Sequence, residues 1–252
     1  MRRAFALAAG LASALLLTAC DRIAPDDEAF GRRVRAYLLE HPEVLQEAIT
    51  RLQSKMAADQ EAATQKLLPA HRRAIERDAR DFVANPNGAI TVTQFYDYRC
   101  PHCINVAPKV VALIRDNPDV RVVFKEMPIF GEPSEHGARV ALAVKQSGGD
   151  YVAFYEQAMA GRFTEPGEFD RLAVAQGAPS AAVNGADEAE AIRKHLADTT
   201  QLFQTLNLGG TPAFIVGDRV IPGEQIELVR AEIQRLRAGS PAPYRPVAKP
   251  AA

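Results

Sequence analysis

The chain has 252 residues, of which 30 are lysine or arginine and 31 are aspartate or glutamate, so its formal net charge is −1 at pH 7. A chain of this length is long enough for one or two domains with a sizeable core. The near-neutral sequence contains no long basic run, so binding to a nucleic acid is disfavoured.

The first twenty residues have the pattern of a secretory signal. Arg2 and Arg3 precede an uncharged, largely apolar run from Ala4 to Ala19, which is too short for a stable membrane span. The run ends in Leu-Thr-Ala-Cys, which resembles the bacterial lipobox, so we expect Cys20 to be lipidated and to become the mature N-terminus. Asp21 resembles the signal that retains such lipoproteins at the inner membrane. The alternative is ordinary signal cleavage that removes Cys20.

Residues 21–85 are predicted to be helical, with no strand. Apolar residues recur at helical spacing, at Phe30, Val34, Tyr37 and Leu38 in a first helix and at Leu45, Ile49, Leu52 and Met56 in a second helix after Pro42. Such a stripe is typical of a short coiled coil or bundle. We therefore expect residues 21–85 to form an oligomerisation stalk. The alternative is a helix packed on the chain's own following domain.

A turn-forming Asn-Pro-Asn-Gly sequence marks the start of a second predicted domain, residues 86–237. An apolar β run from Ile90 to Phe95 is followed by a predicted helix over 101–115 and a second strand, Val120–Phe124. This order and spacing predict a βαβ unit.

Helical periodicity returns over residues 134–206 and is followed by a predicted hairpin. Its strands are Ala213–Val216 and Val220–Ile221, joined by a Gly-Asp tight turn. A closing helix is expected from Glu224 to Leu236. The last residues, 238–252, are rich in proline and alanine and are predicted to be disordered.

Two of the three cysteines, Cys100 and Cys103, stand at the predicted start of a helix with two residues between them. A disulfide between them closes a very small loop and adds little stability, so the pair is expected to react. Backbone N–H groups and the helix dipole favour a thiolate at Cys100, and His102 adds a partly positive neighbour. Pro101 fits the first helical position. Cys100 is therefore predicted to be the exposed nucleophile and Cys103 the buried resolving thiol.

Two other uses of a Cys-x-x-Cys pair fit this sequence poorly. Zinc would need two further ligands at matching spacing, but the chain has no second cysteine pair, and His136 or His195 could join only by chance. His195 lies on a charged helix face and is predicted to be at the surface. Haem attachment requires a histidine where this chain has Ile104. We therefore expect no metal and no cofactor other than a redox-active Cys100–Cys103 disulfide.

The residues FYDYRCPHC, followed by INVAP, resemble the DsbA-like branch of the thioredoxin superfamily, where Cys-Pro-His-Cys is the typical active site. Pro108 matches the proline that kinks the active-site helix of that superfamily. The resemblance implies an α/β thioredoxin fold with a helical insertion at about 131–206. It also implies a cis peptide bond between Thr211 and Pro212, which would expose the Thr211 backbone to a bound peptide. The N-terminal sequence EAFGRRVRAYLLEHPEVLQEAI resembles the stalk of ScsC-like proteins, which form trimers.

The sequence departs from the DsbA-like pattern near the cysteines. Oxidases of this branch bury an acid six residues before the first cysteine, where this chain has Gln94, an amide that cannot act as a base. Asp97 is closer to Cys100 in the sequence. Because side chains alternate between the two faces of a strand, we expect Asp97 to point away from the cysteines. Lys125 and Glu126 could supply a charged pair near the buried thiol; a solvated strand end is the alternative. Thr211 before the cis proline is more usual in isomerases than in oxidases.

These features predict a disulfide isomerase of the bacterial periplasm, held at the inner membrane by a lipid on Cys20. Its expected partners are exported proteins with thiols or disulfides, further copies of itself, with a trimer favoured, and a membrane thiol reductase relay that keeps Cys100 reduced. The alternatives are a monomeric DsbA-like oxidase and a non-catalytic thiol holdase or metal-handling protein.

Overall fold

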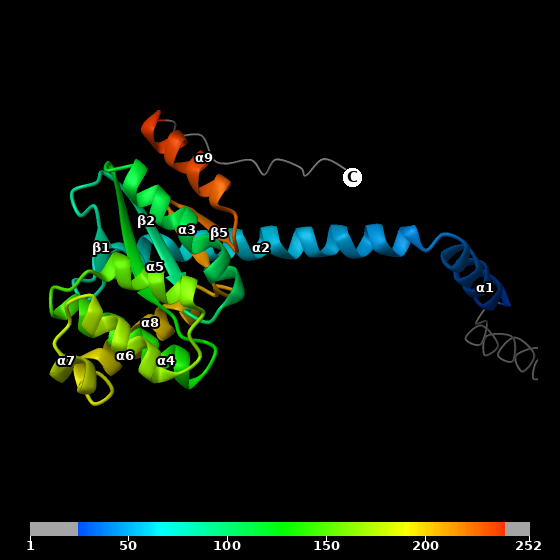
Figure 1. Cartoon of the computed structure of the whole chain (residues 1–252). Helices are drawn as coiled ribbons and strands as arrows, with labels where there is room; N and C mark the ends of the chain where they lie inside the picture. The colour runs from blue at the N-terminus through cyan, green and yellow to red at the C-terminus, as the bar shows by residue number, and fades with distance from the viewer. Residues whose placement is uncertain (1–24, 240–252) are drawn as a thin grey trace, which may run out of the picture. The chain divides into compact units, whose positions relative to one another are not determined.

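The structure is a computed structural model that describes residues 25–239 (Figure 1). The chain divides into two compact units between Ala57 and Ala58, and each unit is described by itself. The predicted signal sequence, lipidation at Cys20 and nearly all of the C-terminal tail lie outside the described residues. Within them, no helix is both long and apolar enough to cross a membrane.

The first unit consists of helix α1 (Pro25–Glu40) and the start of helix α2 (Glu43–Glu76). Large apolar side chains on these helices are 39% to 69% exposed: Phe30, Val34, Tyr37, Leu39, Leu45, Ile49, Leu52 and Met56. We call this set the N-terminal apolar surface. Its exposure leaves the predicted stripe available for contact with another molecule.

The second unit is built on a five-stranded sheet. Its strands are β1 (Phe82–Ala84), β2 (Ile90–Tyr96), β3 (Val120–Glu126), β4 (Ala213–Val216) and β5 (Arg219–Pro222), in the order β1-β3-β2-β4-β5. The central pair, β2 and β3, is parallel, and the other three pairs are antiparallel. The expectation of no strand before residue 86 is wrong for β1, because three residues are too few to show a period of two.

Helix α3 (Pro101–Asp116) connects the two parallel strands, as predicted, and α9 (Ile226–Arg237) closes the fold. The helical insertion lies between β3 and β4, as expected. It comprises α4 (Glu132–Gln146), α5 (Tyr151–Gly161), α6 (Pro166–Ala175), α7 (Ser180–Asn184) and α8 (Glu190–Thr205). These helices gather around α4 beside the sheet (Figure 1).

The C-terminal part of α2 belongs to the second unit. Leu68 and Ile75 are fully buried in an apolar cluster with Phe95 of β2 and Phe203 of α8. The division between Ala57 and Ala58 therefore differs from the boundary expected near residue 85. The alternative to an oligomerisation stalk was a helix packed on the chain's own domain. This alternative is confirmed for the last turns of α2.

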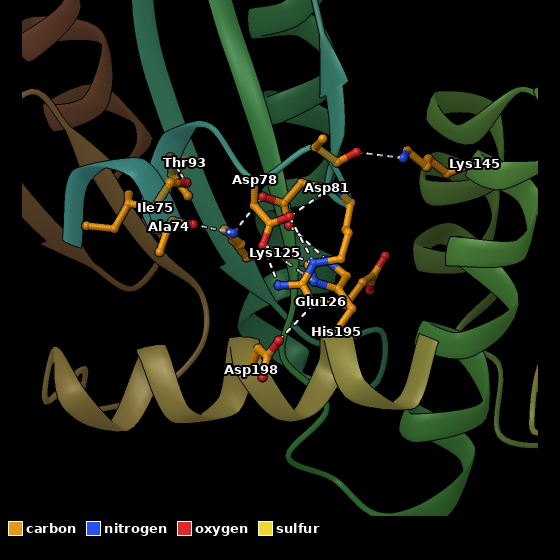
Figure 2. Close-up of polar contacts among 12 residues, drawn as sticks. Ala74, Ile75, Asp78, Asp81, Thr93, Lys125, Glu126, Lys145, His195 and Asp198 are labelled. Carbon is orange, nitrogen blue, oxygen red and sulfur yellow. Dashed lines mark hydrogen bonds and ion pairs between the residues drawn. The ribbon is translucent and has the colours of Figure 1, made fainter. Parts of the chain in front are cut away.

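Side chains from the sheet bind the last carbonyl groups of α2. Lys125 Nζ donates a hydrogen bond to the Ala74 oxygen at 2.6 Å, and Thr93 Oγ1 donates to the Ile75 oxygen at 3.2 Å (Figure 2). A helix leaves its final carbonyls without backbone partners, so these contacts stabilise the helix end and attach it to β2 and β3.

Candidate active site

The end of β2 and the start of α3 place the two cysteines. Cys100 is the N-cap residue of α3, with φ −67° and ψ 118°, and Pro101 occupies the first helical position as predicted. Cys103 lies one turn into the helix and is fully buried; both sulfurs are free thiols. The prediction that Cys100 is exposed is wrong, since only 2% of its surface is accessible. The reason is that its Sγ lies 3.1 Å from the carbonyl oxygen of Thr211, which packs against it.

The two thiols differ strongly in proton affinity. A hydrogen bond from the Cys103 side chain, together with Thr211 and the backbone N–H groups of Cys103 and His102, lowers the pKa of Cys100 to about 5, although burial acts in the opposite direction. Burial, and then the neighbouring Cys100, raise the pKa of Cys103 far above its ordinary value. At neutral pH, Cys100 is therefore a thiolate and Cys103 a thiol.

The loop that enters β4 faces these sulfurs. The Thr211–Pro212 peptide bond is cis, as the family resemblance implied, but Thr211 is buried, so the expectation that this bond exposes Thr211 is wrong. The carbonyl oxygen of Thr211 lies 3.1 Å from Cys100 Sγ and can accept a hydrogen bond only from the protonated thiol. The carbonyl of Pro212 accepts a hydrogen bond from the N–H of Gly223 at 2.8 Å. The cis-proline loop thus contacts the reactive sulfur and is hydrogen-bonded to the loop after β5.

His102 is exposed and paired with a carboxylate. Its Nδ1 lies 2.5 Å from Oε1 of Glu224, which raises the pKa of His102, and His102 in turn lowers the pKa of Glu224. Sequence analysis did not find Glu224. It stands 122 residues away from His102, and no local pattern marks it as part of the site.

Gln94 and Glu126 lie on neighbouring strands behind the cysteines, and both are buried. The Gln94 amide donates a hydrogen bond to the Tyr155 hydroxyl at 3.2 Å. Glu126 Oε1 accepts hydrogen bonds from the hydroxyls of Tyr96, at 2.6 Å, and Tyr151. Burial raises the pKa of Glu126 to about 8 despite these bonds. The solvated strand end considered for Glu126 is therefore wrong.

Lys125 does not pair with Glu126, so the expected charged pair near the thiol is wrong. Successive residues of a strand point to opposite faces, and Lys125 lies on the face that α2 and α8 cover. There it forms a buried ion pair with Asp81, which also contacts His195 at 3.0 Å (Figure 2). His195 is buried too, contrary to its predicted surface position, because this carboxylate gives it a partner.

The Asp97 side chain binds four donors outside the cysteine pair. Its carboxylate accepts hydrogen bonds from the backbone N–H groups of Arg99, Ile129 and Phe130 and from the Ser134 hydroxyl. Ile129 and Phe130 are each 45% exposed. Asp97 therefore fixes an exposed apolar loop next to the segment that leads to Cys100.

Comparisons with known proteins agree with this arrangement. The family described as DSBA-like thioredoxin domain matches residues 91–234, more than half of the chain, and the family described as copper resistance protein ScsC N-terminal domain matches residues 26–59. The crystal structure of Salmonella enterica Typhimurium BcfH has a TM-score of 0.67 and 30% sequence identity, covering 89% of this chain and 98% of BcfH. Proteus mirabilis ScsC in a compact conformation has a TM-score of 0.56 and 27% identity, covering 76% of this chain and 96% of ScsC.

A curated relative is a larger protein. The Na(+)/H(+) antiporter NhaA 1 of Salinispora arenicola (strain CNS-205) is 28% identical in an alignment of 178 positions, and the match covers 64% of this chain. The chain spans 25% of the length of that protein, so the similarity concerns one part of it.

Proposed function

The chain belongs to the DsbA-like thioredoxin family, and we propose that it is a cell-envelope thiol–disulfide oxidoreductase that isomerises disulfides in exported proteins. The observation that carries this proposal is the opposite proton affinity of the two cysteines. The pKa of Cys100 is lowered to about 5, while burial raises that of Cys103 far above its ordinary value. One sulfur is thus a nucleophile at neutral pH, and the other is a protected thiol.

Isomerisation uses Cys100 alone. Its thiolate attacks one sulfur of a substrate disulfide, a bond forms between the two sulfurs, and the substrate S–S bond breaks. The second substrate sulfur leaves as a thiolate and takes a proton from water. Another substrate thiolate then attacks the mixed disulfide and releases Cys100 as a thiolate. The pairing of the substrate has changed without net oxidation or reduction.

Cys103 provides a second way to resolve the mixed disulfide. Its thiol loses a proton to water, its sulfur bonds to Cys100, and the substrate leaves in reduced form, having received two electrons. The raised pKa of Cys103 slows this route and favours isomerisation. Enzyme that becomes oxidised requires a reductant, and we propose that a membrane thiol reductase relay supplies the electrons.

The cis-proline loop is the proposed substrate-binding element. The carbonyl of Thr211 lies directly against the sulfur of Cys100, so a peptide that reaches the sulfur also meets the backbone of this loop. Extended peptides bind backbone groups by β-like pairing, and these main-chain hydrogen bonds select no particular side chain. This suits an enzyme that acts on many exported proteins.

The N-terminal apolar surface supports assembly of several copies. Its exposed side chains lie within the segment, residues 26–59, that matches the ScsC N-terminal domain. We favour a trimer. An oligomer holds several Cys100 sites in one particle, so a substrate released from one site meets another at high effective concentration.

The proposed location is the periplasm, with a lipid on Cys20 as anchor to the inner membrane. The signal-like sequence before Cys20 supports export. An oxidising compartment also supplies substrates for disulfide exchange, because exported proteins acquire their disulfides there.

The proposal is tested by refolding a scrambled multi-disulfide ribonuclease and by reducing insulin, with the wild-type protein and Cys100→Ala. We expect both activities in the wild type and neither in the variant, because Cys103, the other cysteine that the structure describes, is a protected thiol at neutral pH. Unchanged activity in Cys100→Ala would contradict the proposal and leave a binding role for the protein.

A further inference from the structure

The loop between β5 and α9 brings a carboxylate to the start of α3. Oε1 of Glu224 lies 2.5 Å from Nδ1 of His102 and accepts a hydrogen bond from Nδ2 of Asn105 at 3.4 Å. His102 and Asn105 are three residues apart, so they stand on the same side of the helix in consecutive turns. One carboxylate oxygen therefore contacts both and fixes the direction of the His102 ring.

Backbone contacts set the position of Glu224. The preceding residue, Gly223, has a φ of +68°, a conformation that favours glycine, and its N–H donates a hydrogen bond to the Pro212 carbonyl at 2.8 Å. The carbonyl oxygen of the neighbouring Thr211 lies 3.1 Å from Cys100 Sγ. The cis-proline loop thus positions both the reactive sulfur and the loop that carries Glu224.

The charges of Cys100, His102 and Glu224 are coupled. Glu224 is the main cause that raises the pKa of His102, and the sulfur of Cys100 raises it as well. Such an interaction is reciprocal, so a charged His102 stabilises the Cys100 thiolate. Lys109, on the same helix, contributes to lowering the pKa of Glu224. The ionisable groups around the imidazole are thus Cys100 and Glu224, with Lys109 beyond the carboxylate.

We propose that Glu224 is a positioning residue for disulfide exchange, which acts by favouring the charged form of His102 and by directing its ring along α3 beside Cys100. The inference rests on the proposed function and deepens it. A histidine without a carboxylate partner loses its proton near pH 6.5. With Glu224 in place, a larger fraction of His102 is protonated above that pH, and this fraction stabilises the thiolate of the reduced enzyme.

The consequence is a redox equilibrium that depends on Glu224 at neutral pH but not at acid pH. Stabilising the thiolate stabilises the reduced enzyme and makes its disulfide more oxidising. Loss of the Glu224 charge lowers the fraction of His102 that is protonated at pH 7.5, and the equilibrium moves toward the enzyme disulfide. At pH 5.5 the imidazole is protonated with or without Glu224, so this movement does not occur.

The test uses the full-length protein with Glu224→Gln, which removes the charge at constant size. Glu227→Gln is the matched control, because Glu227 is an exposed glutamate of α9 whose carboxylate lies near Arg230. NMR titration of the reduced proteins gives the pKa of His102. Equilibration with glutathione at pH 5.5 and pH 7.5 gives the stability of the enzyme disulfide.

For Glu224→Gln we expect a lower His102 pKa than in the wild type. At pH 7.5 we expect the equilibrium with glutathione to shift about two- to fivefold toward the enzyme disulfide, the effect of one exposed ion pair, with no such shift at pH 5.5. Glu227→Gln should match the wild type in both measurements. A His102 pKa that is unchanged in Glu224→Gln overturns the inference.

A second pair of variants shows whether Glu224 acts through His102. In a His102→Gln background, Glu224→Gln should cause no further shift at pH 7.5. A shift as large as that in the wild-type background overturns the inference. The proposed function has its own test: it is wrong if the wild-type protein neither isomerises nor reduces substrate disulfides. In that case, the titration of His102 still decides whether Glu224 positions this histidine.

Discussion

Lys125 and Asp81 form an ion pair of 2.5 Å in which the two side chains are 1% and 0% exposed. Lys125 also binds the Ala74 carbonyl near the end of α2, and Asp81 also contacts His195 of α8 (Figure 2). The strand, both helices and the segment that leads to β1 are therefore held together by one buried group of charges.

We predict that Lys125→Met destabilises the reduced protein by about 3–5 kcal/mol, because it removes the ammonium partner of the buried Asp81 carboxylate and leaves it only the contact with His195. Lys194→Met is the control, since Lys194 pairs with Asp198 in an exposed position and should cost less than about 1 kcal/mol. Urea unfolding measures both changes. Equal effects of the two substitutions would show that the buried pair has no special role.

Asp97→Ala should destabilise the protein by about 2–4 kcal/mol, because it leaves three backbone N–H groups and the Ser134 hydroxyl without an acceptor. Ser134→Ala removes only one of these bonds and should cost about 1 kcal/mol. Hydrogen exchange at Ile129 and Phe130 should increase in Asp97→Ala. Unchanged exchange at these two residues would contradict the proposed fixing of the loop.

Glu126→Gln should alter the pH dependence of stability. The pKa of Glu126 is raised from 4.5 to about 8, so between these values the folded state keeps a proton that the unfolded state has lost. This contribution is fully present below pH 4.5 and is lost as pH rises through about 8. The wild type should therefore lose up to about 1.4 kcal/mol per pH unit across this window relative to Glu126→Gln.

Unfolding free energies of the wild type and Glu126→Gln, measured from pH 5 to pH 8, test this prediction. Glu156→Gln, at an exposed position of α5, is the control and should follow the wild type. A constant difference between the wild type and Glu126→Gln over the whole range would contradict the raised pKa.

Leu52→Asp should disrupt assembly through the N-terminal apolar surface, because it puts a charge among exposed apolar side chains. Ser54→Asp adds the same charge on about the opposite side of α2 and should leave the assembly intact. Light scattering gives the mass of each variant, and ribonuclease refolding gives its activity. We expect Leu52→Asp to be a monomer with reduced isomerase activity. A wild-type protein that is itself a monomer would favour the oxidase alternative.

The sequence predicted features that depend on local pattern. Cys100 and Pro101 at the start of α3 follow from helix N-terminal chemistry, and the cis bond before Pro212 follows from the family resemblance. The helical insertion was expected from residues 134–206, which contain helical periodicity and no strand pattern.

Features that depend on contacts between distant segments were missed. Glu224 meets His102 only in the folded chain, and His195 has the sequence context of a surface residue although Asp81 binds it in the interior. Lys125 was considered for the side of the thiols. Its contact with α2 could not be predicted, because the sequence does not show that this helix continues onto the sheet. Such contacts carry no periodic signal along the chain.

The most direct test of the account is the titration of the Cys100 thiol in the reduced protein, followed by thiolate absorbance at 240 nm and by the rate of alkylation, with Cys100→Ala as the blank. We predict a midpoint at about pH 5, with Cys103 silent up to pH 9. A midpoint near pH 8.5, the value of an ordinary cysteine, would contradict the proposed activity.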